Sequence, residues 1–117
     1  MPKSDQLFLE DIIEEVNFLL DQTAIVSEPD FSKNPVLQRA FCRSFEVIGE
    51  AVKQLSADFT NKHHQVEWSL MAKTRDKIIH HYSDIDYSLL YLTAKNDLPS
   101  IKLELDKIYE LLPNKIV

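Results

Sequence analysis

The chain has 117 residues, a length that suits one domain with one continuous core. It contains one glycine and five prolines, with 44% hydrophobic and 27% charged residues, which argues against a β-rich or disordered protein. The formal net charge is −6, and within residues 1–30 eight acidic residues stand against a single lysine. A broad basic surface for nonspecific nucleic-acid binding is therefore excluded, and any RNA contact must be local.

Apolar residues recur at spacings of three and four in five segments, as is typical of amphipathic helices. The expected helices lie at about residues 5–22, 35–56, 67–81, 87–94 and 98–112. Residues 23–33 and 58–64 lack this periodicity and are predicted to be connections. With no strand candidate, the sequence predicts an all-α protein, an antiparallel bundle of four to five helices in a single domain over residues 1–117.

Helix ends are marked by capping residues. Either Ser4 or Asp5 can cap the first helix, and either Asp84 or Asp86 can cap the fourth. Asn34-Pro35 is a typical helix start, and Pro113 should stop the last helix. Gly49 lies inside the second helix, where it indicates a neighbouring helix at close approach. The sequence does not identify that neighbour.

The class of protein is further limited by what the sequence lacks. No apolar run approaches the roughly 18 residues needed to cross a bilayer, and the first ten residues do not resemble a signal peptide. Cys42, the single cysteine, is expected to be a small core residue rather than a nucleophile. We therefore expect a cytoplasmic protein without membrane contact.

Common cofactor and metal motifs are also missing. There is no phosphate-binding glycine loop, CxxC pair or HExxH helix. The histidines form two adjacent pairs, 63–64 and 80–81, and neighbours on a helix point about 100° apart, which does not suit chelation. Asp84 and Asp86 are better explained as capping residues than as metal ligands. We expect no metal and no cofactor.

The segment most suggestive of chemistry is Arg75 to Tyr82, in which four residues separate Arg75 from His80 and one separates His80 from Tyr82. A guanidinium fork matches phosphate oxygens, and an imidazole can move a proton at neutral pH. A tyrosine hydroxyl can donate, accept or be modified. As a bare pattern, however, the motif favours a surface arginine with a half-buried histidine.

The spacing of the motif poses a geometric problem. On a continuous helix Arg75 and Tyr82 share a face about 10 Å apart, whereas Arg75 and His80 are about 140° apart. Either the helix ends near His80, or a symmetry mate supplies the second half of the site.

Residues 43–56, RSFEVIGEAVKQLS, resemble the second-helix signature of HepT-like proteins of the HEPN fold. The segment from Trp68 to Tyr82 resembles the one that carries their catalytic motif. Asp86-Tyr87 and residues 96–99 match the end of their fourth helix and the start of their fifth. The resemblance covers about residues 7–112, in order and with compatible spacing.

This resemblance implies a HEPN bundle that forms a homodimer, with both motifs facing one cleft. It implies metal-independent endoribonuclease activity on RNA, with His80 as general acid and base and Arg75 stabilising the charged phosphate. Asp76 would orient Arg75. The protein would be the toxin of a type VII-like toxin–antitoxin system, and an MntA-like minimal nucleotidyltransferase would neutralise it by AMPylation of Tyr82.

Some roles and functions stay open. His81 either assists the chemistry or faces solvent as a spectator, and Glu50 and Arg43 either line the cleft or pair on the helix surface. The alternative function is a non-catalytic substrate-binding subunit of a nucleotidyltransferase, and a third is a helical dimerisation module. The presence of Arg75, His80 and Tyr82 together favours the enzyme.

Overall fold

The computed structural model describes residues 4–112, which form seven helices and no strand. The helices are α1 (Asp5–Ile25), α2 (Glu28–Phe31), α3 (Pro35–Gln54), α4 (Ala57–Lys62), α5 (Trp68–His80), α6 (Tyr87–Asn96) and α7 (Leu98–Glu110). The predicted all-α class is confirmed, and each of the five predicted helices is present. Pro113, the predicted stop of the last helix, lies outside the described residues.

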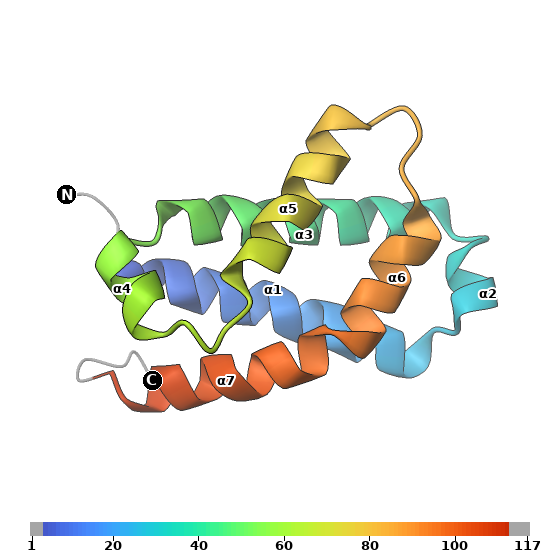
Figure 1. Ribbon diagram of the computed structural model, residues 1–117. Helices are drawn as coiled ribbons and strands as arrows, with labels where there is room; N and C mark the ends of the chain where they lie inside the picture. The colour runs from blue at the N-terminus through green and yellow to red at the C-terminus, as the bar shows by residue number, and fades with distance from the viewer. Residues whose placement is uncertain (1–3, 113–117) are drawn as a thin grey trace.

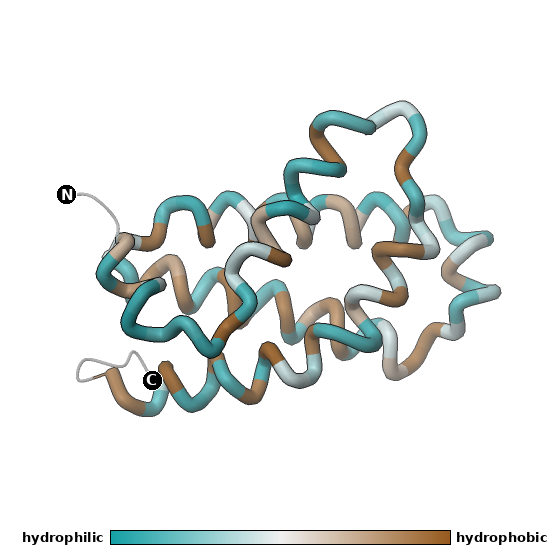
Figure 2. The backbone as a smooth tube through the Cα atoms, viewed as in Figure 1, coloured by the Kyte–Doolittle hydropathy of each residue, from teal (hydrophilic) through white to brown (hydrophobic). Residues whose placement is uncertain are grey.

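The long helices α1 and α3 lie side by side and run through the middle of the view in Figure 1. Helix α7 packs along α1, α6 contacts α1 and α7, and α5 crosses α3. Hydrophobic and hydrophilic positions alternate along the helices (Figure 2), and the hydrophobic ones supply one core. Its most buried side chains, each at most 1% exposed, include Leu9, Ile12, Leu19, Phe41, Phe45, Ile48, Tyr91 and Leu105.

Side-chain caps begin three of these helices where the sequence predicted. The side chains of Ser4, Asn34 and Asp86 each accept a hydrogen bond from the backbone N–H three residues on, at 3.3, 3.0 and 3.0 Å. Ser4 rather than Asp5, and Asp86 rather than Asp84, is therefore the cap.

Both segments predicted to be connections contain a short helix, so that part of the prediction is wrong. Helix α1 continues to Ile25, and α2 then forms around Phe31, whose ring packs 4.7 Å from that of Phe41. Helix α4 places Phe59 against His63, with ring centroids 4.7 Å apart. Each short helix is anchored by one aromatic side chain, and four or six residues are too few to show a helical period.

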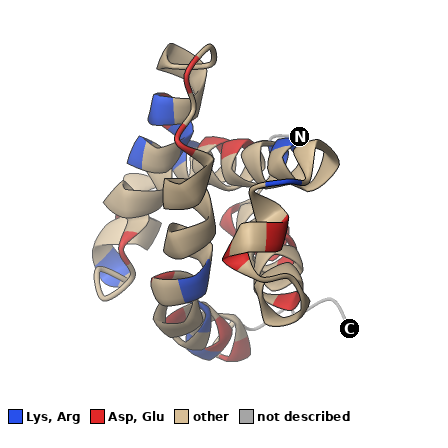
Figure 3. Ribbon diagram, turned by 90° about the vertical axis from the view of Figure 1, so that its right-hand side faces the viewer, with Lys and Arg blue, Asp and Glu red and all other residues tan. Residues whose placement is uncertain are grey.

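The C-terminal end of α5 projects beyond the rest of the bundle, and the connection over residues 81–86 returns from it to α6 (Figure 1). Figure 3 shows basic positions on this projecting helix and acidic positions in the connection that follows. Across residues 4–112, no helix is long and apolar enough to span a membrane. Cys42 is buried at 8% exposure, as predicted, and burial, with the charge of Glu46, raises the pKa of its thiol.

Candidate active site

Helices α3 and α5 approach most closely at Gly49. A Cβ atom on this buried glycine would overlap the Cβ of Arg75, and it would lie 2.7 Å from the Arg75 Cγ and 3.2 Å from the Met71 carbonyl oxygen. The interpretation of Gly49 as a site of close helix approach is confirmed, and the neighbour is the helix that carries the motif. Gly49 thus lets the stem of Arg75 rest directly on the backbone of α3.

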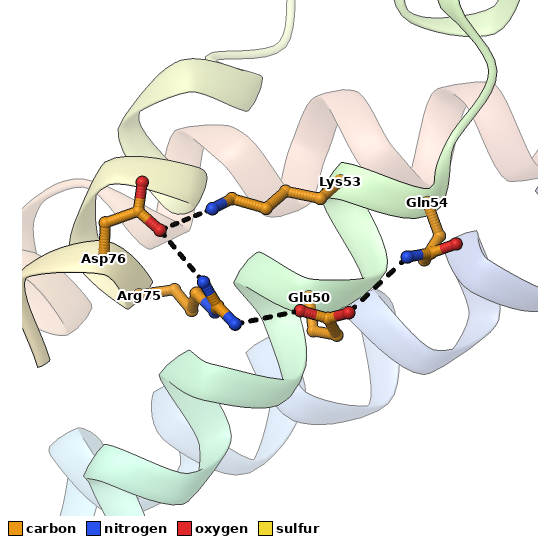
Figure 4. A network of polar contacts seen from close by, with 5 residues as sticks. All are labelled: Glu50, Lys53, Gln54, Arg75 and Asp76. Atoms are coloured by element: carbon orange, nitrogen blue, oxygen red, sulfur yellow. Dashed lines mark hydrogen bonds and ion pairs between the residues drawn. The ribbon is translucent and has the colours of Figure 1, made fainter. Parts of the chain in front are cut away.

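The guanidinium of Arg75 is held by two carboxylates in a network of five side chains (Figure 4). Its Nη2 lies 3.2 Å from Oε2 of Glu50 on α3, and its Nη1 lies 3.1 Å from Oδ1 of Asp76. The same Asp76 oxygen accepts a hydrogen bond from Lys53, and Gln54 Nε2 donates to Glu50 Oε1 at 3.5 Å. The Arg75 side chain is 25% exposed, so the network is open to solvent on one side.

The charges within this network offset one another. Hydrogen bonds from Lys53 and then Arg75 lower the pKa of the Asp76 carboxyl, and the positive charges of both residues add to the effect. Asp76 is therefore ionised at neutral pH. With Arg75 and Lys53 as cations and Asp76 and Glu50 as anions, the group has no net charge.

His80 and Tyr82 lie on the projecting end, apart from this network. His80 is the last residue of α5 and is exposed, and Tyr82 is 81% exposed. Within residues 4–112 no hydrogen bond or ion pair joins either side chain to Arg75. The pattern considered by itself predicted a surface arginine and a half-buried histidine, and the structure shows the reverse, a partly buried arginine and an exposed histidine. Of the two geometric alternatives, α5 does end at His80.

His81 is the first residue after α5. It lines a largely apolar cavity of about 350 Å³ between α5 and α6, together with Ile78, Leu90 and Asp97. Arg75, His80 and Tyr82 are not among the lining residues. Sequence periodicity gave no sign of this cavity, because its shape depends on how α5 and α6 diverge.

Among the described residues the structure shows no ion pair between Glu50 and Arg43, and their place in a cleft stays a prediction. Glu50 pairs with Arg75 across the helix crossing, not with Arg43, although both residues line a shallow hollow on the α3 surface. Sequence reasoning missed Lys53, which lies three residues beyond Glu50 and so on the same face of α3. In the part of the chain that the structure describes, no group of three or more His, Cys, Asp or Glu residues is arranged to hold a metal ion.

Comparison with known proteins assigns the class. Residues 10–108 match the family model described as "Ribonuclease HepT-like". A Methanocaldococcus jannaschii protein named as a candidate RNase is 44% identical over 109 residues, which is 92% of this chain and 90% of that protein. A candidate RNase of Caldanaerobacter subterraneus is 40% identical, covering 92% of this chain and 96% of its own length. "Probable ribonuclease HepT" of Thermococcus cleftensis is 37% identical, covering 92% and 98%.

An all-α fold with this motif and these matches defines a ribonuclease of the HEPN type. The chain belongs to the HepT-like ribonuclease family. As a member of that family it is an RNA endonuclease. No solved structure matches the chain.

Proposed function

We propose that this ribonuclease is the toxin of a type VII-like toxin–antitoxin system, which cleaves RNA without a metal ion and is silenced by AMPylation of Tyr82. The observation that carries the proposal is the contrast between two positions on α5. Arg75 is fixed in the α3–α5 crossing, while His80, five residues on, stands exposed at the helix terminus. Metal-free RNA cleavage requires both a fixed phosphate-binding group and an accessible proton-transfer group.

In the proposed reaction Arg75 binds the scissile phosphate through N–H donors of its guanidinium and stabilises the negative charge that develops there. His80 takes the proton from the ribose 2′-hydroxyl, and that oxygen forms a bond to phosphorus. The bond from phosphorus to the 5′-oxygen breaks, and a protonated imidazole supplies that oxygen with its proton. The products are a 2′,3′-cyclic phosphate and a 5′-hydroxyl.

A two-fold homodimer of this single domain would complete the site, because Arg75 and His80 of one chain do not converge. Pairing the projecting ends of two chains in one cleft would bring two copies of His80 together. One could take the proton from the 2′-hydroxyl, and the other could supply the proton to the 5′-oxygen. Exposed apolar side chains on α5 and α6 favour such pairing, since they gain by being covered. They are Ile79 at 40%, Leu89 at 45% and Leu92 at 38% exposure.

Tyr82 has the accessibility that modification by a second protein needs. Its side chain is 81% exposed, beyond the end of α5, so the active site of a minimal nucleotidyltransferase can reach the hydroxyl. An attached AMP would add bulk and negative charge next to the cleft. Both would compete with RNA for Arg75.

RNA cleavage by purified variants tests the chemistry. His80→Ala and Arg75→Ala should each lower kcat/KM at least about 100-fold, and Arg75→Lys should also be poor because a point charge lacks the bidentate fork. His64→Ala removes another exposed histidine and should leave the rate unchanged. Activity should persist in EDTA, and loss of activity in EDTA with recovery in magnesium would contradict a metal-free mechanism.

Incubation with a minimal nucleotidyltransferase of the MntA type, plus ATP, tests the modification. Intact-mass analysis should show added AMP units that map to Tyr82, are absent in Tyr82→Phe and accompany loss of cleavage. Tyr91 is an internal control, because its side chain is 1% exposed. An adduct on Tyr87 with cleavage intact, or no adduct, would instead favour the nucleotidyltransferase-subunit alternative.

A further inference from the structure

Glu50 already occupies a donor of the arginine that RNA is proposed to use. We infer that the Glu50 carboxylate is a built-in competitor for the RNA phosphate, which must leave Nη2 of Arg75 before the phosphate can bind. Glu50 would then set the affinity for RNA. This inference rests on the proposed phosphate-binding role of Arg75.

The competition follows from the chemistry of the donors. A guanidinium offers five N–H groups in a planar fork, and carboxylate and phosphate oxygens accept from the same edges. Here Nη1 of Arg75 is engaged by Asp76 and Nη2 by Glu50. Bidentate binding of a phosphate needs two parallel donors, and departure of Glu50 frees the Nη2 that such binding uses.

Of the two carboxylates, Glu50 is the one able to leave. Its side chain is 54% exposed, and its other contact is the 3.5 Å hydrogen bond from Gln54. Asp76 is held from two sides, by Lys53 and by Arg75, and it has a shorter side chain with fewer torsions. When Glu50 leaves, Asp76 still orients the guanidinium.

Arg75 itself cannot retreat to resolve the competition. Its Cβ and Cγ rest against the backbone of Gly49, at the point where α3 and α5 are closest. The Cβ and Cγ of Arg75 are therefore held in place, and we expect the more exposed Glu50 carboxylate to be the group that moves when partners exchange. Gly49 and Glu50 are neighbours in the sequence, so the close approach that fixes the arginine also brings the competitor to it.

Charge gives the competition its measurable effect. The group of Lys53, Arg75, Asp76 and Glu50 is neutral overall, and a neutral group attracts a phosphate only weakly. Replacing Glu50 by glutamine keeps the size of the side chain and removes one negative charge. The group then carries a net positive charge, and the phosphate no longer competes with an ionised oxygen.

The test is RNA binding and cleavage by Glu50→Gln, with Glu46→Gln as the matched control. Glu46 lies one turn earlier on α3 and has no ion pair with Arg75 in the described chain, so the control makes the same charge change elsewhere. Binding is measured with a 2′-O-methyl RNA, which lacks the nucleophile and is not cleaved. Glu50→Gln should lower Kd and KM about three- to fivefold, as expected for loss of a partly exposed ion pair, with kcat unchanged.

A double-mutant cycle identifies the partner. In an Arg75→Ala background, Glu50→Gln should lower Kd by much less, because no guanidinium is released and only the change in charge remains. An equal gain in Glu46→Gln, an unchanged or higher Kd in Glu50→Gln, or a fall in kcat at unchanged KM would each overturn the inference. If the wild-type chain neither binds nor cleaves RNA, the proposed function fails first and the inference falls with it.

Discussion

Two parts of one helix behave differently in this molecule. Where α5 crosses α3, Arg75 rests on Gly49 and is fixed by Glu50 and Asp76. At the projecting end, the side chains of His80 and Tyr82 are exposed and have no hydrogen bond or ion pair among the described residues. The fold therefore pre-organises the group proposed to bind phosphate and leaves accessible the groups proposed to transfer a proton and to accept AMP. Pre-organisation needs packing, and proton transfer or modification needs access.

The largest expected effect is on the buried face of α3, which holds the helix crossing in place. Phe41 is fully buried, and its ring packs against Phe31 and Phe18. Phe41→Ala should lower the free energy of unfolding by about 3–5 kcal/mol, the usual cost of a large cavity in a core. Val36→Ala, on the same helix but 78% exposed, is the control and should cost far less. Urea denaturation measures both, and similar losses for the two would mean that α3 does not anchor the core.

Gly49→Ala tests the helix crossing itself. Whether the substitution raises or lowers the free energy of unfolding shows how tightly α3 and α5 are packed there. In an ordinary helix interior this substitution stabilises by up to about 1 kcal/mol. Here the new Cβ would overlap the Cβ of Arg75, which is attached to the backbone and cannot move cheaply. We expect a loss of about 1–3 kcal/mol by thermal or urea denaturation, together with loss of RNA cleavage as Arg75 shifts. A gain in stability would show that α3 and α5 can separate freely.

The sequence predicted features that depend on local structure and missed those that depend on tertiary contacts. The long helices were predicted because several turns make their period visible, and Gly49 indicated a close helix contact. The short helices α2 and α4 were missed for lack of turns. The pairing of Arg75 with Glu50 and the role of Lys53 were missed because they depend on where two helices cross. Spacing along one helix carries no information about that position.

A smaller effect is expected from His63, which is buried, unlike the exposed His80. His63 is 8% exposed and packs against Phe59, and burial, with a smaller effect from Lys62, lowers its pKa from the ordinary 6.5. Between that lowered pKa and 6.5 the unfolded chain binds more protons than the folded one. The free energy of unfolding should therefore fall as the pH drops from 6.5 through this window.

The variant His63→Phe keeps an aromatic ring in the same place and removes the titrating group. Urea titrations at a series of pH values should show a flatter dependence for this variant than for the wild type. Identical pH profiles would mean that His63 is as accessible to protons in the folded chain as in the unfolded one.

The smallest expected effect is at the projecting end, where removal of one hydroxyl can be compared between two tyrosines. The hydroxyl of Tyr91 donates to the Val26 carbonyl at 2.7 Å, and its side chain is 1% exposed, so Tyr91→Phe should cost about 0.5–1.5 kcal/mol. Tyr82 is 81% exposed, and its hydroxyl has no hydrogen bond within residues 4–112, so Tyr82→Phe should change the free energy of unfolding by less than about 0.5 kcal/mol. Urea denaturation at two protein concentrations measures both. A loss for Tyr82→Phe as large as that for Tyr91→Phe, present only at the higher concentration, would place the Tyr82 hydroxyl in the dimer interface, where an AMP-transferring partner could reach it only by separating the two chains.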